Sequence, residues 1–152
     1  MLHPASLLIP LMILLPNLVF VRFPPTSSPP RRTINLLLNA CEAIGRLGVM
    51  VVPLFYSMRA ERSYETISLI VMLAALLFYY KGWIRYLRSD RSYARLLTPM
   101  LGIPVPMAVF PCLYFFAASV VLHSILFFIF SASFAFGHIT NSYKDSLLIG
   151  KS

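Results

Sequence analysis

The sequence predicts an all-α integral membrane protein. Its single transmembrane domain, residues 1–152, is a helical bundle of about five transmembrane helices, with four as the alternative. Hydrophobic residues make up 59% of the chain and charged residues only 12%, against about 25% charged in soluble domains. Because this number of charged residues is too small to cover the surface of a soluble domain, lipid must surround much of the chain. The apolar runs are also long enough to span a bilayer, at 5–22, 34–56, 66–83, 105–121 and 125–142.

The first run, 5–22, is expected to be an uncleaved spanning helix, because no Lys or Arg precedes it as in a secretory signal peptide. Pro10 and Pro16 each lack a backbone donor, which predicts kinks in this helix. Residues 23–33 form a proline-rich loop, and the composition favours a stiff, extended connection. A ligand for a proline-binding partner is the alternative interpretation of this loop.

The second run, 34–56, carries an acid and a base inside an otherwise apolar helix. Glu42 and Arg46 are four residues apart, so they share a helix face and can pair. Asn35 and Asn39 continue the same face toward the start of the run, which makes one polar stripe. The small residues Ala40, Gly45 and Gly48 would let another helix approach closely.

The third run, 66–83, ends in aromatic and basic residues, as helices do at the level of lipid headgroups. It is followed by a basic loop, 84–104, predicted to be cytoplasmic. Four arginines recur in it at spacings of three and four residues, and they predict contacts with anionic lipid headgroups. They are Arg85, Arg88, Arg91 and Arg95.

The last apolar stretch is too long for one straight span. Residues 105–139 contain no Lys, Arg, Asp or Glu, and one helix of that length would measure about 52 Å, against a hydrocarbon core of about 30 Å. We therefore expect two helices, 105–121 and 125–142, joined by a turn at His123. One long tilted helix, or a span with a re-entrant piece, is the alternative.

Charge predicts the orientation in a cell membrane, either a plasma membrane or a bacterial inner membrane. With five spans, most of the 13 Lys and Arg residues fall on the side that holds loops 23–33 and 84–104 and the C-terminus. The positive-inside rule therefore places the C-terminus in the cytoplasm and the N-terminus outside. The formal net charge of +8 is explained by these loops, and no nucleic-acid-binding motif or basic soluble domain accompanies it.

The polar stripe of Glu42, Arg46, Asn39 and Asn35 has two interpretations. It lines a substrate or ion pathway, or it is a structural ion pair that holds helices together. A secondary polar cluster, His138 and Asn141, lies one helical turn apart at the cytoplasmic end of the last run. We hypothesise that His138, Asn141 and Glu42 meet.

The sequence predicts neither catalytic residues, nor a metal site, nor a cofactor. Cys41 and Cys112 lie in apolar runs without metal spacing and are expected to pack as small apolar residues. No known catalytic motif occurs, so an enzyme is less expected than a protein without catalytic activity.

Three functions stay open. The first is a transport or channel component with a polar site inside the membrane, and the second is a structural or accessory subunit of a larger membrane complex. The third is a membrane-embedded enzyme that acts on lipid. The expected partners are membrane lipids, with anionic headgroups at the cytoplasmic face, and a homo-oligomer or another membrane protein.

Overall fold

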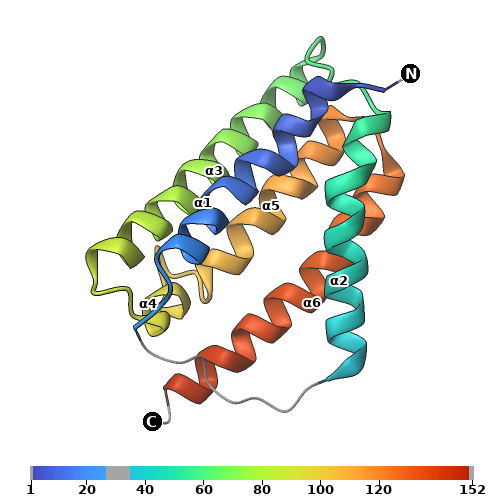
Figure 1. Cartoon of the computed structure of the whole chain (residues 1–152). Helices are drawn as coiled ribbons and strands as arrows, with labels where there is room; N and C mark the ends of the chain where they lie inside the picture. The colour runs from blue at the N-terminus through green and yellow to red at the C-terminus, as the bar shows by residue number, and fades with distance from the viewer. Residues whose placement is uncertain (1, 27–34, 151–152) are drawn as a thin grey trace.

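A computed structural model of the chain describes residues 2–26 and 35–150. These residues form helices and no β-strand, which confirms the predicted all-α fold (Figure 1). Residues 27–34, with Arg31, Arg32 and most of the predicted proline-rich loop, lie outside the described part, as does Lys151. The helical elements are η1 (Pro4–Leu7), α1 (Leu8–Arg22), α2 (Leu36–Val51), η2 (Val52–Phe55), α3 (Ser63–Arg88), α4 (Tyr93–Leu97), α5 (Pro106–Val121) and α6 (Ile125–Ile149).

The chain is a membrane-type helical bundle. Four helical segments are long and apolar enough to cross a membrane, and α5 is a shorter apolar helix. Large apolar side chains on the outside are more than half exposed, which a bundle in water avoids and a bundle in lipid requires. Examples from four helices are Leu18, Leu36, Leu47, Ile70 and Ile125.

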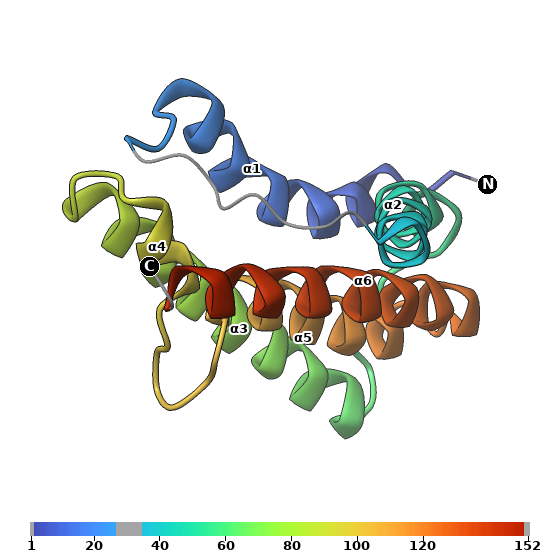
Figure 2. The same cartoon turned by 90° about the horizontal axis from the view of Figure 1, so that it is seen from below.

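Two helices lie over a layer formed by three others. The most extensive helix pairs are α2 with α6, α3 with α5, and α5 with α6, so α5 is the central helix of the layer. Figure 2 shows α1 and α2 on one side of that layer, with α2 seen nearly along its own axis. Aromatic side chains fill the centre of the layer, among them Phe110, Phe115 and Phe127.

A set of tyrosines ties α1 to α3. Pro16 lacks the N–H that would bond the carbonyl of Met12 in a regular helix, and the Tyr80 hydroxyl donates to that carbonyl at 2.9 Å instead. The Tyr79 hydroxyl donates to Asn17 at 3.0 Å. A partner helix therefore satisfies a backbone group that proline leaves open, as lipid surroundings demand.

The last apolar stretch contains two helices, α5 and α6, with a break at Leu122–Ser124. His123 adopts a left-handed conformation with φ 50°, and the Ser124 hydroxyl accepts a bond from the N–H of Phe127 at 3.1 Å, which caps α6. Two helices extend past the apolar runs predicted from the sequence, since α3 continues to Arg88 and α6 to Ile149. Buried Tyr86 and Asp145 anchor these extensions.

Loops that the sequence assigned to one side gather at the same end of the bundle. At one end the N–H of His3 bonds Leu54 O at 2.7 Å, and the N–H of Arg59 bonds Val121 O at 2.9 Å. At the other end the Thr26 hydroxyl bonds Asp90 O at 2.8 Å. We refer to this second end, with α4 and the C-terminus of α6, as the basic end.

Candidate functional site

Glu42 on α2 is the centre of a polar cluster that joins α2 to α6. Its Oε1 lies 2.7 Å from an Arg46 guanidinium nitrogen and 3.0 Å from His138 Nδ1. Its Oε2 accepts from Asn141 Nδ2 at 2.8 Å. The hypothesis that Glu42, His138 and Asn141 meet is therefore confirmed, and the two predicted polar groups form one cluster.

The two asparagines of the polar stripe take different places. Asn39 Oδ1 accepts from Asn141 Nδ2 at 3.1 Å, so it belongs to the cluster. Asn35 lies at the start of α2, where its side chain accepts from the N–H of Leu38 at 3.1 Å and caps the helix. Capping ties Asn35 to its own helix, and no described contact links it to Glu42.

Glycines make the close approach of α2 and α6 possible. A Cβ at Gly137 on α6 would lie 2.5 Å from Leu38 O and 2.6 Å from Glu42 N, both backbone atoms. A Cβ at Gly45 or Gly48 on α2 would collide with Phe134 or Phe130 of α6. Of the three small residues predicted to admit a neighbouring helix, Gly45 and Gly48 thus pack against α6 of the same chain, while Ala40 is exposed.

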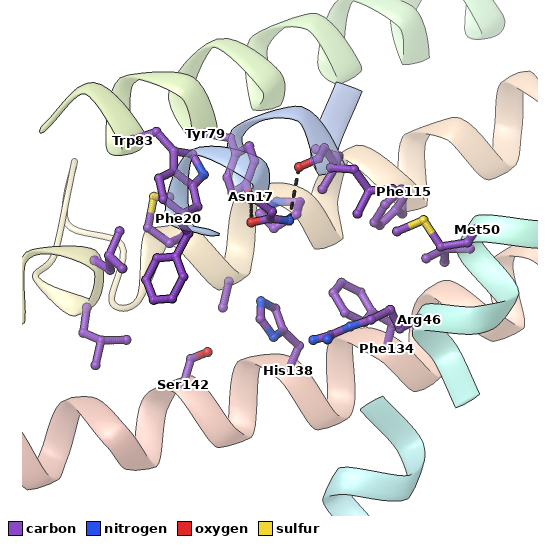
Figure 3. A pocket seen from close by; sticks show the side chains of 18 of the residues that line it. Asn17, Phe20, Arg46, Met50, Tyr79, Trp83, Phe115, Phe134, His138 and Ser142 are labelled. Atoms are coloured by element: carbon purple, nitrogen blue, oxygen red, sulfur yellow. Dashed lines mark hydrogen bonds between the residues drawn. The ribbon is translucent and has the colours of Figure 1, made fainter. Parts of the chain in front are cut away.

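A cavity of about 490 Å³ lies beside the polar cluster. Figure 3 shows Arg46, His138 and Ser142 on one wall, and Asn17, Phe20, Tyr79 and Trp83 on the opposite wall. Arg46 lies 6.0 Å over the ring of Phe134, and His138 stacks on the same ring at 4.8 Å. The lining continues through Leu96 and Leu97 of α4, so the cavity extends toward the basic end.

The two side chains of the ion pair differ in their exposure. The side chain of Glu42 is 16% exposed and that of Arg46 is 56% exposed, and only Arg46 lines the cavity. Arg46 and His138 therefore form part of the wall surface. Glu42 lies behind them and holds both side chains in place through its contacts with them. Glu42 thus contacts α6, and Arg46 contributes to the surface of the cavity.

The four arginines of the predicted basic loop are not equivalent. The Arg85 guanidinium turns inward and donates to the carbonyls of Arg95 at 3.1 Å and Thr98 at 3.0 Å. The Arg95 Nε donates to the Ser89 hydroxyl at 3.2 Å. Neither Arg88 nor Arg91 has a described side-chain hydrogen bond, and Arg88 is exposed.

The polar contacts that were not predicted from the sequence include those of Asn17 and Glu65. Asn17, the one polar residue of α1 before the terminal Arg22, lines the cavity and bonds Tyr79; its isolation was the available signal. Buried Glu65 accepts from the N–H groups of Glu61 and Arg62, and it lies 2.6 Å from His123 Nε2 at the end opposite the basic end. The short polar loop before α3 gave no signal for that pairing.

The arrangement defines a helical membrane protein with a mostly apolar cavity and one polar wall inside the bundle. Within the described residues, no group of three or more His, Cys, Asp or Glu side chains is placed to hold a metal ion. The chain matches no known family, no curated protein and no solved structure.

Proposed function

We propose that this protein is a small transport component of a cell membrane and that the transported molecule occupies the cavity beside Glu42. One observation carries the proposal: Arg46 and His138 contact Glu42 and also line a cavity of about 490 Å³ inside the bundle. Ionisable residues within a membrane protein are expensive and commonly serve ion or substrate pathways. Binding sites between the helices of a bundle have about this size.

An accessory subunit has less support. That function was based on small residues and the basic loop as docking faces for another chain, and of these Gly45 and Gly48 pack against α6 of this chain. An enzyme acting on lipid would need an activated nucleophile near His138. Ser142 lines the cavity with His138, yet within the described residues no serine or cysteine hydrogen-bonds this imidazole.

We also propose that the basic end faces the cytoplasm in a plasma or inner membrane, which puts the N-terminus outside. Arg22, Lys81 and Lys144 lie on helices that finish at this end, together with the arginines of residues 85–95. Cytoplasmic loops are enriched in such residues. Arg88 and Arg91, whose side chains are not engaged by the loop itself, are the proposed contacts with anionic headgroups.

Cysteine accessibility tests the transport proposal without a known substrate. In a chain that carries Cys41→Ser and Cys112→Ala, Leu14→Cys and Ser142→Cys place one thiol on each cavity wall. Leu73→Cys, on the outer face of α3, is the matched lipid-facing control. We expect a charged, membrane-impermeant thiol reagent to modify both cavity positions from each side of sealed vesicles and to spare position 73.

Modification of the cavity positions from neither side, or from one side only, would contradict transport, because a transported molecule must reach the cavity from both.

A further inference from the structure

We infer that the cavity binds an amphipathic anion, a molecule with one acidic group and an apolar body of the kind found in long-chain carboxylates and alkyl phosphates. This inference deepens the proposed function and depends on the same cavity. The acidic group would contact Arg46 and His138. The apolar body would lie along the opposite wall and toward α4.

The polar wall offers donors to an anion. Arg46 uses one guanidinium nitrogen for Glu42 Oε1, and a guanidinium has five N–H donors on its edges. It can therefore hold Glu42 by one edge and a ligand anion by another. His138 Nδ1 lies 3.0 Å from the same oxygen, and its Nε2 can donate to an anion only when the imidazole is protonated, so Arg46 is the main donor.

The described residues that line the cavity include no acidic side chain that could pair with a cationic ligand. Glu42 lies behind Arg46 and His138, with both oxygens accepting hydrogen bonds from donors on α2 and α6. A ligand in the cavity thus meets the cation of the pair and is separated from the acid.

The rest of the lining suits an apolar body. Ile13, Leu14 and Phe20 of α1 face the cavity, with Leu96 and Leu97 of α4 at the basic end. Met50 and Met107 also line it, and methionine adapts its shape to irregular apolar ligands.

The opposite wall offers little further hydrogen bonding, since Trp83 Nε1 is its only buried donor without a partner among the described residues. Asn17 and Tyr79 bond each other across the α1–α3 contact at 3.0 Å, and Asn17 Nδ2 also donates to Ile13 O. A ligand with polar groups along its whole length, such as a sugar, would leave those groups without partners. One polar end and one apolar body is the matching chemistry.

The chain carries its own reporter of binding. Trp83 is the single tryptophan, and it lines the cavity opposite Arg46 and His138 (Figure 3). Protein in nanodiscs of uncharged lipid would be titrated at mildly alkaline pH with four probes of equal chain length. These are dodecanoate, dodecyl phosphate, dodecanol and dodecylamine, and tryptophan emission would be followed.

We expect one or both anions to bind at least about tenfold more tightly than dodecanol, which corresponds to about 1.4 kcal/mol. The difference between the two anions identifies a carboxylate or a phosphate as the preferred group. Arg46→Gln should abolish the preference and Arg46→Lys should keep part of it. Arg59→Gln, a loss of one cation at the opposite end, should leave it unchanged.

Equal affinity for dodecanol and both anions, or tighter binding of dodecylamine, would overturn the inference, as would an anion preference that survives Arg46→Gln. These results are separable from the transport test. Cavity thiols that react from both sides without an anion preference would leave transport standing and remove the ligand class. Anion binding in a protein whose cavity thiols do not react would support the ligand class and contradict transport.

Discussion

Glu42 and Arg46 were predicted as a pair, but their surroundings are unequal. Glu42 accepts bonds from Arg46, His138 and Asn141, which come from two helices. Arg46 has one described hydrogen bond, to Glu42, and is more than half exposed. The contacts therefore concentrate on the acid, and the base can be removed with less structural damage.

We predict that Glu42→Gln lowers the stability of the bundle and that Arg46→Met does not. The loss of the carboxylate weakens bonds between α2 and α6 and should reduce the free energy of unfolding by about 1–2 kcal/mol. Arg46→Met removes one exposed bond and should change it by less than about 0.5 kcal/mol. Thermal unfolding in detergent, followed by circular dichroism, measures both.

The double variant should be no less stable than Glu42→Gln alone. Equal losses for the two single variants, with recovery in the double variant, would contradict this division and make the pair one structural unit.

Much of this cluster could be foreseen, since spacing alone placed Asn39, Glu42 and Arg46 on one face of a helix. Spacing cannot specify which distant helix packs on that face. Glu42 lies 96 residues from His138 and 99 residues from Asn141 in the sequence. Their contact could therefore be stated only as a hypothesis. The cavity itself depends on the packing of six helices, which local sequence does not encode.

The α2–α6 contact depends on a glycine with a matched control on the same helix. Gly137→Ala would push a Cβ into backbone atoms of Leu38 and Glu42, and such overpacking costs about 1–3 kcal/mol. Gly150→Ala at the end of α6 meets no atom closer than 3.7 Å, and its φ of −69° suits alanine. We predict a lower melting temperature for Gly137→Ala and an unchanged one for Gly150→Ala.

Differential scanning fluorimetry or circular dichroism in one detergent would compare the two glycine variants with the parent chain. Equal melting temperatures for both variants would mean that α2 and α6 do not approach as closely as described.

Helix existence was more predictable than helix ends. The apolar runs located the helices, and the polar Leu122–Ser124 interruption located the break that the left-handed His123 and the Ser124 cap produce. The extensions of α3 and α6 were missed because the apolar signal stops where basic and polar residues begin. Helical hydrogen bonding continues there, and buried Tyr86 and Asp145 support it.

For the assembled bundle, the separation of charge between its ends predicts orientation. Single cysteines at Ala60 and Leu101, in a chain without Cys41 and Cys112, lie at opposite ends and are both exposed. An impermeant thiol reagent on intact cells should modify Ala60→Cys and should reach Leu101→Cys only after permeabilisation, because basic loops stay in the cytoplasm. Labelling of Leu101→Cys on intact cells would reverse the proposed orientation.

Hydrogen bonds join the helices of the bundle in two pairs, α1 with α3 and α2 with α6, which form its two halves. Tyr79 and Tyr80 of α3 donate to α1 and Tyr86 donates to Phe23 O directly after α1, while Glu42 joins α2 to α6. The cavity lies between these halves, and α5 touches both α3 and α6. A transport cycle of the kind we propose would move these halves about α5 and would break the hydrogen bonds that cross between them, such as the one from Ser6 Oγ to Tyr56 O at 2.6 Å.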